Sequence, residues 1–134
     1  MPVRRRKEPR WITRAALSAI HAAQLREHGG KAGVRDANLI EAALARPRQK
    51  WNYNPDTDIA MLAAAYSFGL AKNHGFIDGN KRVAFMAAYS FLGLNGFDFY
   101  ASEADVVEKI ERLAAGKVSE RQLAEWFQRG LRPD

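Results

Sequence analysis

Two apolar segments near the centre of this 134-residue sequence restrict its possible folds more than any other feature. The first runs from Ile59 to Lys72 and the second from Val83 to Leu94, and in both of them apolar residues occupy almost every side of a helix. Helices that are apolar all round are usually buried. Each segment is too short to span a bilayer, which takes about 20 apolar residues. We therefore expect the two segments to form the central helix pair of an all-α bundle, and we expect no membrane insertion.

Capping residues and glycines predict the remaining helices. Thr13 caps a helix that ends at Gly29 and Gly30, and Asp36 caps a short helix that Pro47 should stop within a residue or two. A loop containing Trp51 and Tyr53 should follow, and Asp56 should open the first central segment.

Two more helices are expected near the end of the chain. Ser102 with Asp105 starts one that Gly116 ends, and Ser119 with Gln122 has the spacing of a capping box. Period-two alternation occurs only around Gly96–Tyr100, so at most a strand fragment is expected there. The expected fold is a compact bundle of about six helices, with an antiparallel central pair.

Composition narrows the classes of function. The chain has no cysteine, which excludes disulfides, thiolate zinc sites and cysteine nucleophiles and suits a cytoplasmic location. Of the net charge of +6, a charge of +4 falls in the first ten residues. We therefore predict a basic flexible tail at 1–10 and a single domain at 11–134, and we do not expect direct nucleic-acid binding.

The stretch NHGFIDGNKRVAF, residues 73–85, joins the two apolar segments. If Asn80 begins the second helix, the free backbone N–H groups from Gly79 to Arg82 point at one spot, and such a spot attracts anions. Lys81 and Arg82 would each oppose the helix dipole at a cost of about 0.3–1 kcal/mol. The sequence therefore predicts a bound anion at this helix end.

Neighbouring residues supply the other groups that phosphate chemistry needs. Asp78 is a hard oxygen ligand suited to Mg²⁺, and His74 has the chemistry of a general base at neutral pH. Phe76 should anchor the loop between the helices. A lone histidine or an Asp-Gly-Asn turn is most often structural, but the two together with the misplaced cations favour a functional site. Lys72 is either a further phosphate contact or an ordinary basic residue at a helix C-terminus.

The residues His74-Gly-Phe76-Ile-Asp78-Gly79-Asn80-Lys81-Arg82 resemble the signature of the Fic/Doc family, in particular its death-on-curing (Doc) toxin branch with the pattern H-x-F-x-D-x-N-K-R. HAAQLREHGG at 21–30, RDANLIEAAL at 35–44 and GLNGF at 93–97 also look like Doc segments in the same order. The resemblance covers most of residues 11–130 and implies a compact all-α bundle.

The resemblance also implies an activity. Adenylyl-transferring Fic proteins follow the pattern H-P-F-x-x-G-N-G-R-x-x-R, whereas this chain has Lys81 in place of the second glycine and Phe85 in place of the final arginine. Like Doc toxins, it would transfer the γ-phosphate of ATP. His74 would be the base, Asp78 the Mg²⁺ ligand, and Gly79, Asn80, Lys81 and Arg82, with Lys72 as a weaker candidate, would bind the phosphates.

The implied biology is that of a toxin in a toxin-antitoxin system. The family's target is a threonine of elongation factor Tu, whose modification blocks translation, and a cognate antitoxin protein neutralises the toxin. Two alternatives remain open: a Fic-type adenylyltransferase and a non-catalytic binding or regulatory module. The apolar cluster of Leu123, Trp126 and Phe127 should be core, with a part exposed to an antitoxin helix. His21 and His28 are expected to have no chemical role.

Overall fold

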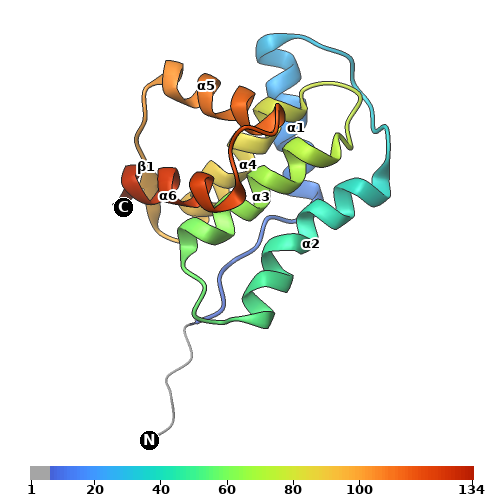
Figure 1. Cartoon of the computed structure of the whole chain (residues 1–134). Helices are drawn as coiled ribbons and strands as arrows, with labels where there is room; N and C mark the ends of the chain where they lie inside the picture. The colour runs from blue at the N-terminus through green and yellow to red at the C-terminus, as the bar shows by residue number, and fades with distance from the viewer. Residues whose placement is uncertain (1–6) are drawn as a thin grey trace, which may run out of the picture.

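The computed structural model describes residues 7–134 and contains six helices over that range. They are α1 (Arg14–His28), α2 (Ala37–Tyr53), α3 (Ile59–Asn73), α4 (Asn80–Leu94), α5 (Glu103–Ala114) and α6 (Glu120–Gly130). Two short strands, β1 (Phe97–Phe99) and β2 (Leu131–Pro133), complete the fold. Figure 1 shows α3 crossing the middle of the molecule, with α5 and α6 together on one side. The prediction of a six-helix, all-α bundle is confirmed.

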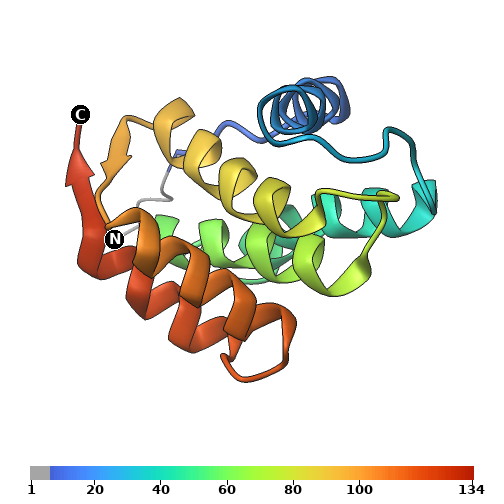
Figure 2. The same cartoon turned by 90° about the horizontal axis from the view of Figure 1, so that it is seen from above.

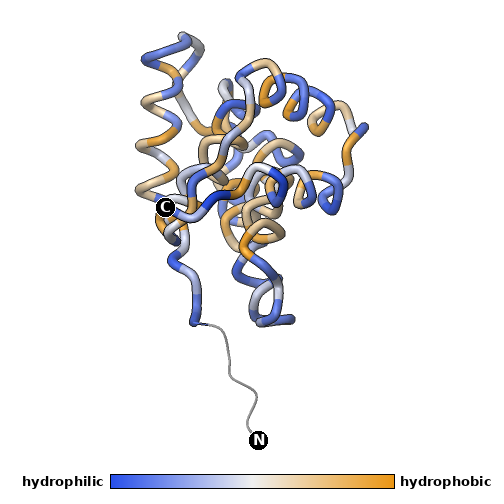
Figure 3. The backbone as a smooth tube through the Cα atoms, turned by 90° about the vertical axis from the view of Figure 1, so that its left-hand side faces the viewer, coloured by the Kyte–Doolittle hydropathy of each residue, from blue (hydrophilic) through white to orange (hydrophobic). Residues whose placement is uncertain are grey.

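The central pair is α3 and α4, as the apolar segments predicted. Figure 2 shows the two helices running side by side between α1 and the α5–α6 layer. Ten residues of α3 are buried, including Tyr66 and Ser67, and the Ser67 hydroxyl donates to the Ala84 carbonyl of α4 at 2.6 Å. Alanines on both helices allow this close approach, because they hold no side chain beyond Cβ. The outer helices instead alternate hydrophobic and hydrophilic residues from turn to turn (Figure 3).

Capping residues predicted most helix starts correctly. Thr13, Asp36, Ser102 and Ser119 each accept a hydrogen bond from a backbone N–H in the first turn of their helix, and Ser119 with Gln122 forms the predicted capping box. The cap of α3 is Asp58, whose side chain accepts from the Met61 N–H, so the prediction that Asp56 opens this helix was wrong by two residues.

The predicted end of α2 was also wrong, because the helix continues through Pro47 to Tyr53. Proline in a helix removes one hydrogen bond and usually stops or kinks the helix. Here Pro47 is buried, and beyond it Trp51 packs edge-on against Trp11 with ring centroids 6.3 Å apart. The packing of this last part of the helix offsets the lost bond. Trp51 and Tyr53 therefore belong to a helix and not to a loop.

The strand fragment predicted at 96–100 is β1, and its partner is the end of the chain. β1 pairs antiparallel with β2, with Phe97 opposite Pro133 and Phe99 opposite Leu131. The pairing brings the C-terminus back against the segment that follows α4. Sequence periodicity gave no indication of β2, since three residues are too few to show a period.

The N-terminal side of the domain is tied to the core by specific contacts. The Tyr66 hydroxyl accepts the Ile12 N–H at 2.9 Å, and burial raises the pKa of this tyrosine to about 12. Arg10 exchanges two hydrogen bonds with Asn95. Residues 1–6, which hold most of the predicted basic tail, lie outside the described residues, so the proposed division at residue 10 stays a prediction. No helix in the described range has the length and apolar character that a membrane span requires.

Candidate active site

The motif loop begins at His74, which ends α3 in a left-handed conformation (φ 50°, ψ 48°). A non-glycine residue rarely adopts a positive φ. Arg35 holds this turn in place: its Nε donates to the His74 carbonyl at 2.7 Å and its Nη2 to the Asn73 carbonyl at 3.0 Å. A cation that binds the last carbonyls of a helix also interacts favourably with the helix dipole. The His74 side chain is left exposed at the helix end.

Asn80 closes the loop on itself. Its Oδ1 accepts the Phe76 N–H at 3.0 Å and its Nδ2 donates to the Phe76 carbonyl at 2.9 Å. The Phe76 ring is buried, as the sequence predicted for the anchor of the loop. Sequence reasoning assigned Asn80 to phosphate binding, whereas its side-chain amide here binds the backbone of the loop.

His21, on α1, supports the same loop from the side. Its ring stacks on Phe76 with centroids 3.9 Å apart, and its Nε2 lies 2.8 Å from the Asp78 carbonyl oxygen. The residue is buried, with 7% of its surface exposed. The sequence assigned His21 no chemical role and did not indicate its contact with Asp78. The sequence likewise did not indicate that Arg35 contacts the loop, because only the fold brings Arg35 and His21 to it.

The start of α4 presents unpaired backbone donors. Gly79 precedes the helix with φ 82° and supplies no side-chain cap. Among residues 7–134, no protein acceptor takes the N–H groups of Asn80, Lys81 and Arg82. Free N–H groups at a helix start, together with the dipole, attract anions. Asn80 does begin the helix, as the prediction of an anion site required.

Asp78 lies beside this helix end with its carboxylate exposed. Its Oδ1 accepts the Gly79 N–H at 2.9 Å, and its Oδ2 accepts the Lys31 N–H at a longer 3.3 Å. These bonds hold the carboxylate between Gly79 and Lys31 and leave lone pairs on both oxygens for a further ligand. The Gly79 N–H, predicted to hold phosphate, is bonded to Asp78 in this structure.

The two cations at the start of α4 are both exposed. Lys81 extends to α5, where its Nζ lies 3.0 Å from Glu111 Oε2. Arg82 makes no ion pair within the described part of the chain. Exposed ion pairs are worth at most about 1 kcal/mol, so an anion at the helix end could readily compete for Lys81.

A cleft of about 890 Å³ brings these groups together. Six of the seven predicted site residues line it: His74, Asp78, Gly79, Asn80, Lys81 and Arg82. The rest of the lining comes mainly from α4 and α5 and combines apolar residues, such as Phe85, Met86 and Ile110, with Glu103 and Glu111. Lys72 is not part of the lining. Its Nζ instead lies 5.8 Å from the centre of the Phe68 ring, as expected for a structural residue at a helix end.

Comparisons with known proteins agree with the motif. A family model described as the Fic/DOC family matches residues 11–92. The protein named "Protein kinase doc" of Escherichia phage P1 is 31% identical over 120 residues, which cover 90% of this chain and 94% of that protein. "Toxin Doc" of Mycolicibacterium smegmatis is 45% identical over 80 residues, which cover 58% of this chain and 60% of that protein.

Proposed function

The chain belongs to the Fic/DOC family, and from this premise we propose that it is a toxin of a toxin-antitoxin system that transfers the γ-phosphate of ATP to a hydroxyl of a protein target. The observation that carries the proposal is the meeting of His74, Asp78 and the unpaired N–H groups of α4 in one cleft. Phosphoryl transfer depends mainly on positioning and on charge stabilisation, and these groups supply both.

His74 acts as the base in this proposal. Its exposed ring takes the proton of the target hydroxyl while that oxygen forms a bond to the γ-phosphorus. The bond between the γ-phosphorus and the bridging oxygen breaks, and ADP leaves. Arg35 keeps the histidine at the rim of the cleft through its bonds to the Asn73 and His74 carbonyls. The backbone N–H groups of Lys81 and Arg82, with their side-chain charges, stabilise the charge on the phosphoryl oxygens.

Asp78 fits the role of a Mg²⁺ ligand. Mg²⁺ in nucleotide sites is commonly held by one or two carboxylates together with substrate phosphates and water. The Asp78 carboxylate is exposed, keeps free lone pairs and lies next to the proposed phosphate position. When bound, the ion would neutralise phosphate charge.

Phe85 favours phosphate transfer over AMP transfer. This residue stands where adenylyl-transferring Fic patterns have their final arginine, and it packs among Phe99, Trp126 and Phe127 with ring centroids 6.1–6.4 Å apart. The position therefore holds an aromatic core contact and no cation. A nucleotidyltransferase remains the second candidate, because the anion site at the start of α4 does not by itself distinguish transfer of the γ-phosphate from transfer of AMP.

The target and the partner are proposed on the family relationship. The target would be a threonine of elongation factor Tu, which would place the protein in the cytoplasm and its effect in translation. Its partner would be a cognate antitoxin. Trp126, expected to be partly exposed for an antitoxin helix, is only 8% exposed, so docking there would be limited to the edge of its ring.

Labelled ATP tests the proposal. The protein is incubated with elongation factor Tu and Mg²⁺, and with ATP that carries the label at either the γ or the α position. Label from the γ position alone should be retained on the target. Retained α-label would establish adenylyl transfer and refute the kinase reaction.

Two variants distinguish the proposed catalytic residue from a basic residue outside the cleft. His74→Ala should lose transfer by at least about 100-fold, since general-base catalysis contributes about 10²–10⁴-fold. Lys72→Met should keep it, because Lys72 lies outside the cleft. If His74→Ala still inhibits growth while deletion of residues 1–10 abolishes inhibition, the chain is a non-catalytic binding module.

A further inference from the structure

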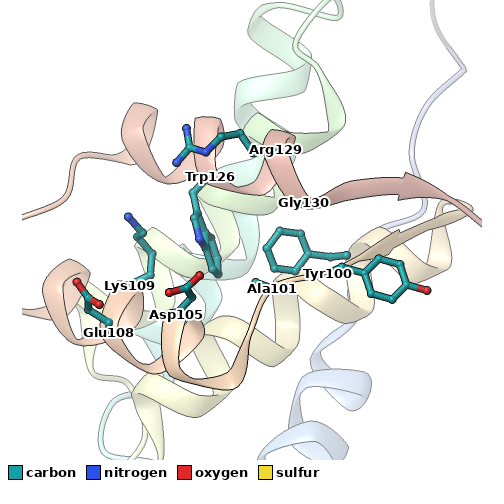
Figure 4. A pocket seen from close by; sticks show the side chains of 9 residues that line it. Tyr100, Ala101, Asp105, Glu108, Lys109, Trp126, Arg129 and Gly130 are labelled. Atoms are coloured by element: carbon teal, nitrogen blue, oxygen red, sulfur yellow. The ribbon is translucent and has the colours of Figure 1, made fainter.

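A second cavity, of about 330 Å³, lies between α5, α6 and the residues that follow β1 (Figure 4). It shares only Phe99 and Ala101 with the lining of the first cleft. The motif residues do not line it, so it has no role in the proposed phosphate transfer. At this volume it lies at the lower end of the range of about 300–1,000 Å³ that small-molecule pockets span.

Trp126 supplies an unused hydrogen-bond donor in this cavity. The residue is 8% exposed, and none of the hydrogen bonds found within residues 7–134 uses its indole N–H. The Trp11 Nε1 is sealed without a partner, whereas the Trp126 Nε1 is not sealed. Figure 4 shows its nitrogen on the side of the ring that faces Lys109. An indole N–H is a donor only, so the Trp126 N–H can serve an acceptor that enters the cavity.

Four charged side chains surround the indole: Asp105, Glu108 and Lys109 from α5, and Arg129 from α6. Asp105 and Lys109 are four residues apart on one helix, a spacing at which opposite charges usually pair. No ion pair joins any of these four residues within the described range. Lys109 is nevertheless half-buried. The lining thus holds two separated positive and two separated negative groups.

We propose that this cavity binds a small zwitterion of the amino-acid type. The carboxylate of the ligand accepts hydrogen bonds from Trp126 Nε1, Lys109 and Arg129, and its ammonium group lies near Asp105. Hydrogen bonds from charged donors to a carboxylate, and from an ammonium group to the Asp105 carboxylate, are both favourable contacts. The lining has no net formal charge, which suits a ligand with one charge of each sign. A phosphate would face the repulsion of both carboxylates.

Indole resonances in a ¹H–¹⁵N NMR spectrum of the full chain test this binding. The three tryptophans give three indole signals, and Trp126→Phe identifies one of them while keeping an aromatic ring in the core. L-Leucine should shift the Trp126 signal saturably and leave those of Trp11 and Trp51 in place. Leucinamide, which lacks the carboxylate, and 4-methylpentanoate, which lacks the amine, should each bind at least about tenfold more weakly.

Substitutions at the cavity rim give the second arm of the test. Lys109→Met and Asp105→Asn should each weaken L-leucine binding by about tenfold or more. Arg121→Met is the matched control, because Arg121 lies on α6 outside the cavity and is 89% exposed. Asp105 is exposed and Lys109 is only half-buried, so these variants keep the test valid even if Trp126→Phe does not fold. An unmoved Trp126 signal, equal shifts with all three compounds, or unchanged binding in both rim variants would each overturn the proposal.

Discussion

Replacing Asn80 with alanine should destabilise the protein even without any ligand. Asn80 makes two hydrogen bonds to the Phe76 backbone, at 3.0 and 2.9 Å, and the site is part-buried. Each such bond contributes about 0.5–1.5 kcal/mol, so the loss should lower the free energy of unfolding by about 1–3 kcal/mol. That is a large share of the 5–15 kcal/mol typical of a small domain.

Urea denaturation followed by circular dichroism measures this change. With a slope of about 1–3 kcal/mol per M, the midpoint should fall by about 1 M. Lys81→Met is the matched control at the next position, because its exposed ion pair with Glu111 contributes no more than about 1 kcal/mol. If Asn80→Ala unfolds at the wild-type midpoint, the two bonds contribute nothing to stability, and our structural interpretation of Asn80 is wrong.

Two further predictions concern contacts outside the motif loop. Burial raises the pKa of Glu120, but the hydrogen bonds and charges of Arg46 and Lys50 together outweigh this effect and hold the pKa below its usual 4.5. The stabilisation is therefore present above pH 4.5 and lost as the pH falls through the lowered pKa. Thermal unfolding measured at a series of acid pH values should show the wild-type stability fall by about 1 kcal/mol more than that of Glu120→Gln. Parallel curves for the two proteins would contradict this. Gly130→Ala should cost about 1–3 kcal/mol in urea, because its Cβ would lie 2.4 Å from Phe99 Cε1; an unchanged midpoint would show that β1 moves freely.

Helix starts were predictable because their causes are local. The Thr13 hydroxyl bonds the Ala16 N–H only three residues away, and the Ser119 capping box involves residues within one turn. Pro47 was misjudged for the opposite reason. Its usual effect on a helix is local, but the contact of Trp51 with Trp11, which offsets it, joins residues 40 positions apart in sequence.

Part of the site could be predicted and part could not. The residues from His74 to Arg82 are neighbours in sequence, so any turn between two buried helices keeps them together at one end of the pair. The positions of Arg35 and His21 depend on how α1 and the segment before α2 pack beside that turn. Nothing in their own sequence neighbourhood marks them as contacts of the loop.

The sequence alone therefore determined the number of helices, most of their starts, the central apolar pair and the identity of the motif, because caps, periodicity and a short run of residues act over one or two turns. Only the tertiary structure decided how each motif side chain is used: Asn80 binds backbone, Lys81 pairs with α5, and the N–H groups at the start of α4 stay open. A side chain's partner is set by which distant segment packs against it, and burial of apolar surface across the whole domain fixes that arrangement.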